Sequence, residues 1–229
     1  NFKRTLLAGA VALAVSAPAA AQFSNVYFFG DSLTDTGSFK PVLPPGTGLF
    51  TTNPGPVWAP VFGAQYGFAV TPANQGGTDY AQGGARVTQL PGVPDQPPTA
   101  TAVPVATQVS QFLAKGPANP NAIYSVWAGA NDLFYQLGLA QAGLVTPAEV
   151  QANLATAATQ NVQLVAALRA GGAQTIIVFN LPDIGKTPFG VGSGQAAQIS
   201  ALSSLYNSVL GAGLDAAGIP TIRVNAFGF

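Results

Sequence analysis

Short runs of consecutive apolar residues alternate along this chain with longer stretches in which apolar residues recur every three or four positions. The short runs are typical of strands buried on both faces, and the longer spacing is typical of helices with one buried side. Each short run is also rich in β-branched and aromatic residues. We therefore predict five strands, at 26–29, 68–70, 123–127, 175–179 and 221–224.

The clearest helical stretch covers residues 147–170. Thr146 is placed to cap its first turn, and Glu149 would complete a capping box with it. Gly171 and Gly172 follow as a stop signal, because glycine tolerates the left-handed conformation that often ends a helix. Shorter helices are predicted at 57–66, at 105–115 before Gly116, and at 195–210 before Gly211 and Gly213.

Alternation of strands and helices is the pattern of an α/β protein with a parallel sheet. We predict a three-layer α/β/α sandwich with a five-stranded parallel sheet, in which ligands bind at the carboxyl ends of the strands. The Pro- and Gly-rich segments 41–56 and 91–104 are interpreted as irregular loops over that edge.

Residues 1–21 have the pattern of a secretory signal peptide. Basic residues near the start are followed by an apolar stretch at 6–15 and by alanines at 19–21. That stretch is far shorter than the roughly 20 residues of a membrane-spanning helix, so we expect cleavage before Gln22 and one domain over 22–229. Because the chain begins with Asn and has no Met, we also expect it to be part of a longer protein.

The amino-acid composition argues against several classes of function. Only 7% of the residues are charged, with eight basic and eight acidic side chains and no basic cluster, which argues against nucleic-acid binding. The chain has no Cys, so disulfides and thiolate metal sites are excluded. It also has no His, the usual general base of serine hydrolases and a common metal ligand.

A candidate nucleophile follows the first predicted strand. Ser32 lies in the sequence Gly-Asp-Ser-Leu that begins at Gly30, where a hydroxyl would reach the carboxyl edge of the sheet. On spacing alone, a helix N-cap is the favoured interpretation of this serine. Asp31 and Asp35 are interpreted as residues of the turn and of a helix start rather than as catalytic groups.

The segment 29–37 resembles the first sequence block of the GDSL, or SGNH, hydrolases, a family of serine esterases and lipases. Asp79 begins a segment similar to the second block, N-x-A-x-G-G-A, with Asp in place of the usual Asn. Gly129 begins a segment similar to the third block, G-x-N-D, and Asn180 one similar to N-L-P-x-x-G. The resemblance runs from about residue 25 to the end of the chain and implies the flavodoxin-like fold of that family.

The resemblance also implies a mechanism without a cofactor or metal. Ser32 would be the nucleophile, and the oxyanion hole would comprise the backbone amides of Ser32 and Gly84 and the side chain of Asn131. An ordinary turn is the alternative interpretation for Gly83 and Gly84, and a helix cap for Asn131.

Three side chains near these blocks also have alternative roles. Arg86 could meet a polar group of the substrate, although solvent exposure is slightly favoured. Phe134 and Tyr135 could line an acyl pocket.

Within the family, the chain looks most like the passenger domains of bacterial autotransporter esterases. That likeness implies export to the outer-membrane surface or medium of a Gram-negative-type bacterium, and an outer-membrane β-barrel in the same full-length chain. We expect a monomer that acts on small-molecule or lipid esters.

One block of the family pattern is missing. The family's D-x-x-H block supplies the histidine base, and these residues contain no His. Truncation before that block is our expectation, with this chain nearly inactive by itself. The alternative is a non-catalytic exported binding or adhesion domain on an esterase scaffold.

Overall fold

The computed structural model describes residues 23–44, 50 and 55–228, so the predicted signal peptide and its cleavage site lie outside the described residues. The strands are β1 (Val26–Gly30), β2 (Ile123–Trp127), β3 (Thr175–Phe179) and β4 (Ile222–Val224). The helices are α1 (Trp58–Gln65), α2 (Val105–Leu113), α3 (Ala130–Gln141), α4 (Pro147–Ala170), α5 (Pro188–Gly192) and α6 (Ala196–Ala216). Single turns of 3₁₀ helix occur at Lys40–Val42, Ala73–Gln75, Thr99–Thr101, Ile184–Lys186 and Ala226–Gly228.

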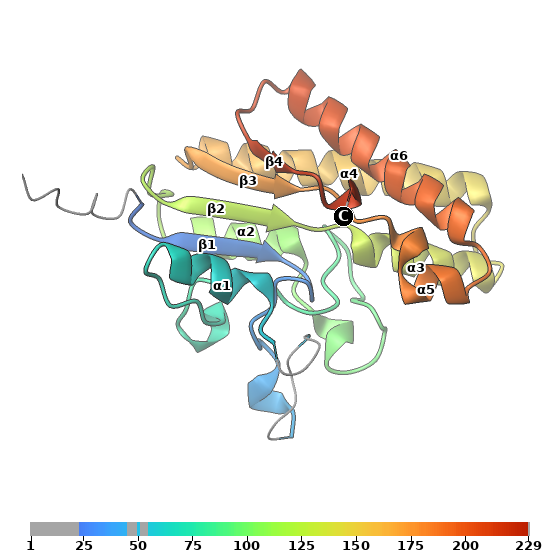
Figure 1. Cartoon of the computed structure of the whole chain (residues 1–229), viewed down its shortest axis with the longest axis horizontal. Coiled ribbons are helices and arrows are strands. Elements are labelled where there is room, and N and C mark those ends of the chain that lie inside the picture. Colours follow the sequence, from blue (N-terminus) through green and yellow to red (C-terminus); the bar gives the residue numbers. More distant parts are fainter. Residues whose placement is uncertain (1–22, 45–49, 51–54, 229) are drawn as a thin grey trace, which may run out of the picture.

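The named strands form one parallel four-stranded sheet in the order β1-β2-β3-β4 (Figure 1). Val26 lies opposite Ile123, and Ile123 lies opposite Thr175 on the next strand. All carboxyl ends therefore point to the same edge, where the chain leaves β1 toward Ser32 and leaves β2 toward Asn131. The predicted parallel α/β architecture is confirmed, but with four named strands rather than five.

The predicted strand at 68–70 is wrong. The outer neighbour of β1 is the segment 78–82, whose Asp79 forms an isolated parallel bridge with Phe28. Phe28 N–H donates to the Thr78 carbonyl, Tyr80 N–H donates to the Phe28 carbonyl, and Gln82 N–H donates to Gly30. The run at 68–70 is apolar for another reason, because Val70 packs under α1 in the hydrophobic cluster that includes Phe28.

Helices cover both faces of the sheet. On one face, Val26, Phe28 and Ile177 pack with α1 in one hydrophobic cluster. On the other, Phe29, Tyr124 and their neighbours pack with α2, α3, α4 and α6 in a larger cluster. Side chains that alternate along each strand therefore enter two cores of unequal size, as expected for buried parallel strands.

The helix at 147–170 is confirmed, including its capping box. Thr146 Oγ1 accepts a hydrogen bond from Glu149 N–H, and the Glu149 carboxylate accepts one from Thr146 N–H at 2.7 Å. Gly172 then takes a φ of 116°, so the left-handed stop is one residue beyond the cap. These signals are local, which is why the sequence alone could place this helix.

The predicted end of the last helix is wrong, because α6 continues through Gly211 and Gly213 to Ala216. A Cβ on Gly213 would lie 2.8 Å from Val162 Cγ2 of α4. This glycine therefore permits close contact between the two longest helices rather than ending one of them. The left-handed stop falls instead at Gly218, with a φ of 60°.

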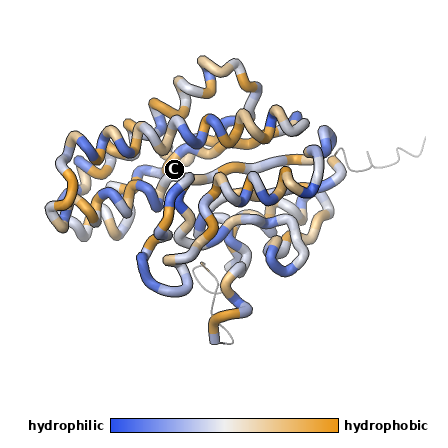
Figure 2. The backbone as a smooth tube through the Cα atoms, turned by 180° about the vertical axis from the view of Figure 1, so that it is seen from behind, coloured by the Kyte–Doolittle hydropathy of each residue, from blue (hydrophilic) through white to orange (hydrophobic). Residues whose placement is uncertain are grey.

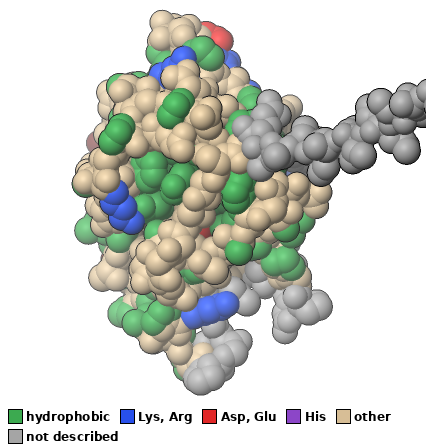
Figure 3. Space-filling model, turned by 90° about the vertical axis from the view of Figure 1, so that its left-hand side faces the viewer, with side chains coloured by type: hydrophobic (Ala, Val, Ile, Leu, Met, Phe, Trp, Pro, Cys, Tyr) green, Lys and Arg blue, Asp and Glu red, His purple; other side chains and the backbone are tan. Residues whose placement is uncertain are grey.

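Hydrophobic and hydrophilic positions alternate along these long helices (Figure 2). On the face at the amino ends of the strands, charged side chains are few and scattered (Figure 3). Among the described residues, no helix has both the length and the apolar character needed to cross a membrane.

Candidate active site

Ser32 lies in a tight turn at the carboxyl end of β1. The Asp31 side chain accepts a hydrogen bond from Leu33 N–H at 3.0 Å, and the Asp31 carbonyl accepts from Thr34 and Asp35 N–H, each at 3.0 Å. Asp31 therefore caps this turn, and the interpretation of Ser32 as the cap is wrong. Ser32 is only partly buried, and its hydroxyl makes no hydrogen bond to another residue in the part of the chain that the structure describes.

Two carboxylates join the turn to the segment that resembles the second block. Asp35 accepts from Ser38 N–H and from Gly83 N–H, at 2.7 and 2.8 Å. Asp79 accepts from Thr36 N–H at 2.8 Å. Both carboxylates are buried, so they act as internal bridges rather than as surface charges. The interpretation of Asp35 as a turn residue is confirmed.

The Gly83 contact distinguishes the two adjacent glycine amides. Since Gly83 N–H donates to Asp35, it is already engaged within the protein. Gly84 N–H has no hydrogen-bond acceptor among the described residues, and Gly84 adopts a φ of 85°, where only glycine is unstrained.

Asn131 enters the site from the first turn of α3. Gly129 is the N-cap of this helix, so the alternative that Asn131 caps it is wrong. Asn131 Nδ2 donates to the Ala85 carbonyl at 3.0 Å, and Asp132 Oδ2 accepts from Val87 N–H at 2.9 Å. These bonds tie the third block to the second, as Asp35 and Asp79 tie the second to the first.

Arg86 is buried, so the slight preference for solvent exposure was wrong. Its Nε lies 3.4 Å from the Asp132 carboxylate, and its guanidinium stacks 4.0 Å from the centre of the Tyr135 ring. The positive charge balances a carboxylate that is held in the interior by its bond to Val87 N–H. Tyr135 therefore packs on Arg86, whereas Phe134 packs edge-on against Phe189 with ring centres 4.9 Å apart.

The N-L-P-x-x-G segment organises the end of β3. Trp127 Nε1 donates to the Asn180 carbonyl at 3.1 Å. The Asn180 side chain donates to Asn225 Oδ1 and accepts from Phe227 N–H. Asn180 therefore joins the ends of β2, β3 and β4 at the carboxyl edge.

Sequence reasoning missed two polar side chains that fix strand ends at this edge. Gln108 of α2 accepts from Gly30 N–H and donates to the Gly30 carbonyl, both at 2.9 Å. Tyr206 of α6 donates to the Ala128 carbonyl at 2.9 Å and accepts from Asn161. Gln108 could have been noticed as a polar residue on the buried face of its helix.

Burial controls the ionisation of the carboxyls around Ser32. It raises the pKa of Asp31 to about 7, and that of Asp79 also to about 7, each against the hydrogen bonds that favour the charged form. It raises the pKa of Asp132 as well, opposed by Val87 N–H and Arg86. Asp31 Oδ2 is buried without a hydrogen-bond partner.

The carboxyl edge thus brings together Ser32, Gly84 and Asn131 from segments that are far apart in the sequence. The family model for GDSL-like lipases and acylhydrolases matches residues 26–218. The chain belongs to this family. The name of this GDSL-like family covers lipases and acylhydrolases.

Three curated relatives are similar to this GDSL-like chain at 30% to 31% identity. Lipase 1 of Photorhabdus luminescens is 31% identical over 79% of the chain, and esterase EstA of Pseudomonas aeruginosa is 31% identical over 92%. Phosphatidylcholine-sterol acyltransferase of Aeromonas hydrophila is 30% identical over 89%. The chain spans 26%, 36% and 58% of the lengths of the lipase, the esterase and the acyltransferase.

A solved structure shares the fold. Est24, a carbohydrate acetylesterase from Sinorhizobium meliloti, aligns with a TM-score of 0.50 and 19% identity, over 89% of this chain and 84% of that one. At this identity the likeness supports the fold alone.

Proposed function

We propose that the whole protein hydrolyses carboxylic esters through an acyl intermediate on Ser32. Ser32 Oγ attacks the ester carbonyl, the alcohol leaves, and water then releases the acid. The observation that carries this proposal is the free, partly exposed Ser32 hydroxyl on a turn that buried carboxylates tie to the two neighbouring blocks.

The negative charge that develops on the carbonyl oxygen needs fixed donors. We assign this role to the amides of Ser32 and Gly84 and to Asn131 Nδ2. Neither backbone amide donates to another described residue. Asn131 Nδ2 carries two hydrogens and gives one to Ala85, which leaves the second for the substrate. The amino end of α3 adds a positive partial charge beside them.

These residues contain no histidine that could act as the general base for Ser32. The 229 residues contain no His, and no described carboxylate accepts a hydrogen bond from Ser32 Oγ. We propose that an Asp-x-x-His block outside these residues provides the imidazole in the whole protein. Without it Ser32 remains a poor nucleophile, and we expect a loss of roughly 10⁴ or more in rate.

We further propose that residues 1–21 direct export and that the mature protein works as a monomer at the outer-membrane surface or in the medium. The apolar stretch at 6–15 and the alanines at 19–21 support the export step of this proposal. The substrates would be small-molecule or lipid esters.

The proposal is tested with Ser32→Ala in the whole protein. Hydrolysis of p-nitrophenyl butyrate should fall by roughly 10⁴ or more while the circular dichroism spectrum is unchanged. Ser110→Ala changes an exposed serine of α2 and is the matched control, which should retain full turnover. Retained turnover by Ser32→Ala would remove Ser32 from the mechanism. A folded wild-type protein with no esterase activity would favour the non-catalytic binding domain.

A further inference from the structure

Gln108 of α2 is a polar side chain buried in the core beside the turn that carries Ser32. It is 1% exposed, and Phe112, one turn farther on the same side of the helix, is buried and apolar. A buried amide costs free energy unless it is hydrogen-bonded. Gln108 Oε1 accepts from Gly30 N–H, and Gln108 Nε2 donates one hydrogen to the Gly30 carbonyl and one to the Val103 carbonyl, with all three bonds at 2.9 Å. The amide therefore makes every hydrogen bond that its two hydrogens allow.

This amide replaces one backbone bond at the end of β1. The Phe28 carbonyl accepts from Tyr80 N–H of the segment outside β1, in the pattern of a parallel pair. Two residues farther, the same pattern would pair Gly30 N–H with the Tyr80 carbonyl. Gly30 N–H donates to Gln108 Oε1 instead, while the Gly30 carbonyl still accepts from Gln82 N–H at 3.2 Å. A side chain of α2 therefore fixes the last N–H of β1 before the turn.

Gln108 and Gln82 close a ring of hydrogen bonds at this point. Val103 N–H donates to Gln82 Oε1 at 2.9 Å, and the Val103 carbonyl accepts from Gln108 Nε2. The ring returns through Gln82 N–H to the Gly30 carbonyl, so it joins β1, α2 and the segment that resembles the second block. Hydrogen bonds in such a buried network strengthen one another. Loss of the Gln108 amide would therefore loosen Gly30 at both of its backbone groups.

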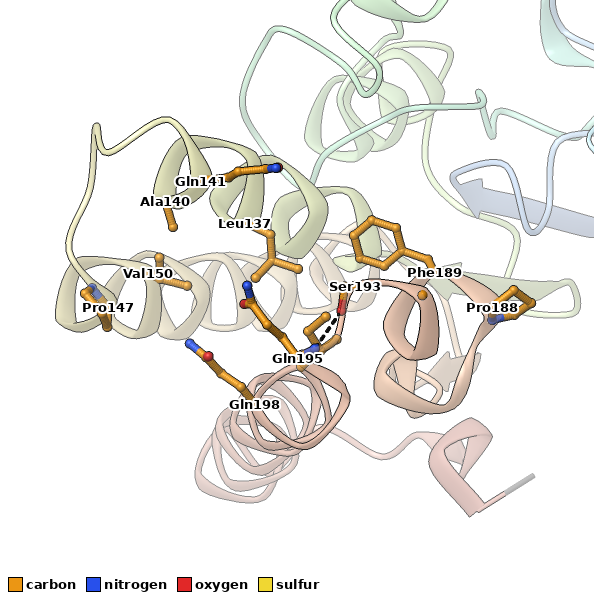
Figure 4. A pocket seen from close by; sticks show the side chains of 12 residues that line it. Leu137, Ala140, Gln141, Pro147, Val150, Pro188, Phe189, Ser193, Gln195 and Gln198 are labelled. Carbon is orange, nitrogen blue, oxygen red and sulfur yellow. Dashed lines mark hydrogen bonds between the residues drawn. The ribbon is translucent and has the colours of Figure 1, made fainter.

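Gly30 is confined from two sides, by Gln108 and by β2. A Cβ on Gly30 would lie 2.5 Å from the carbonyl oxygen of Trp127, the last residue of β2. The cavity of about 520 Å³ between α3, α4, α5 and α6 is lined by neither Gln108 nor any residue assigned to the reaction (Figure 4). None of its described lining residues hydrogen-bonds to Gly30 or Ser32. The polar support of the turn at Gly30 therefore comes from the side of α2.

We propose that Gln108 is a positioning residue for the reaction, an inference that rests on the proposed role of Ser32. Ser32 follows Gly30 by two residues, so the peptide group that Gln108 holds sets the direction in which the turn starts. That direction places the Ser32 hydroxyl and amide, which both act in the transition state of the proposed reaction. Their displacement should lower kcat and leave KM little changed. A displacement of about 1 Å can cost about 10²-fold in rate.

Gln108→Glu in the whole protein tests this role through a pH profile. The carboxylate can accept from Gly30 N–H but has no hydrogen for the Gly30 and Val103 carbonyls, whereas the protonated carboxyl has one. Burial can raise the pKa of such a carboxyl to about 8 or 9. We expect kcat for p-nitrophenyl butyrate, relative to the wild type at the same pH, to be roughly 10²-fold lower at about pH 9 and to recover at least about tenfold by about pH 6. KM should stay close to the wild-type value.

Gln111→Glu is the matched control, because Gln111 is exposed on the same helix and undergoes the same chemical change. Its kcat should match that of the wild type at every pH. Gln108→Met is the second variant, since it removes all three hydrogen bonds with little change in side-chain length and adds no titratable group. It should lower kcat by a similar factor, without recovery at low pH, and circular dichroism reports whether each variant is folded.

The outcomes separate this inference from the proposed function. Wild-type kcat in either folded Gln108 variant would overturn the positioning role, and if Gln108→Glu does not fold, Gln108→Met decides alone. A raised KM with unchanged kcat, or a lower free energy of unfolding with unchanged kcat, would make Gln108 a purely structural residue. A Gln108→Glu ratio that stays equally low at every pH would contradict the hydrogen-bond argument. Each of these results leaves the dependence on Ser32 intact, whereas a wild-type protein without esterase activity would overturn both proposals.

Discussion

Asp31→Asn should change how stability depends on pH. Asn keeps the side-chain oxygen that accepts a hydrogen bond from Leu33 N–H. It removes the titratable carboxyl, whose pKa is raised by burial from 3.8 to about 7. Between these two values the unfolded chain has released the Asp31 proton and the folded protein has not. The folded state then binds more protons, so the wild-type free energy of unfolding falls as pH rises.

The size of this pH dependence follows from the one proton that the folded state binds and the unfolded chain does not. The decrease is roughly 1.4 kcal/mol for each pH unit, or about 4 kcal/mol across the whole window, and it is complete once pH exceeds the folded pKa. The Asn variant lacks this contribution, so its advantage over the wild type should grow from about pH 4 to about pH 7 and then level off. Asp79 titrates in a similar range in both proteins and cancels in the comparison.

Urea unfolding at a series of pH values measures this difference. Trp58 and Trp127 provide the fluorescence signal, since their rings belong to one aromatic cluster and lie 6.3 Å apart. Equal pH slopes for the two proteins would refute the reasoning, because Asp31 would then be ionised in the folded state at neutral pH.

Four further substitutions test the site and its support. Asn131→Ala should lower kcat of the whole protein by about 10² to 10³ with an unchanged circular dichroism spectrum, and an unaffected kcat would remove Asn131 from the oxyanion hole. Gly129→Ala should lower the thermal midpoint, because φ is 117° and the new Cβ would lie 2.3 Å from the Tyr206 ring. Gly138→Ala in open space on α3 should instead raise it, so a similar loss in both would contradict the steric argument. Thr146→Ala should cost about 1 kcal/mol of unfolding free energy in urea, and no loss would mean that the capping box is dispensable.

The sequence predicted best the elements whose signals are local. The strands at 123–127 and 175–179 and the helix at 147–170 were predicted with the bounds that the structure has. Continuous apolar runs and a capping box act over a few residues, so they can be recognised without knowledge of the partners. The first and last strands differed from prediction by one residue at one end.

The wrong predictions concern apolar or glycine residues that pack against a segment distant in the sequence. Val70 is apolar because it packs under α1, and Gly213 is a glycine because α4 lies against it. The helix α3 was not among the predicted helices, and it entered only as the alternative in which Asn131 caps a helix; its actual cap is Gly129, with a φ of 117° and no side-chain cap. None of these relations is visible in the spacing of neighbouring residues.

The candidate site was predictable as a set of residues but not as a set of contacts. Motif resemblance singled out Ser32, Gly84 and Asn131 without showing what holds them. The supports are buried polar bonds across long sequence separations, such as Asp35 to Gly83 and Gln108 to Gly30. Such bonds depend on the folded arrangement, because each pairs groups that are far apart along the chain.

Covalent labelling shows whether Ser32 is the nucleophile of the whole protein. The whole protein is treated with a fluorophosphonate, which reacts with activated serine hydroxyls, and the modified peptide is identified by mass spectrometry. We expect one adduct, on Ser32, formed together with the loss of esterase activity and absent from Ser32→Ala. An adduct on another serine, or full inhibition without modification of Ser32, would contradict it.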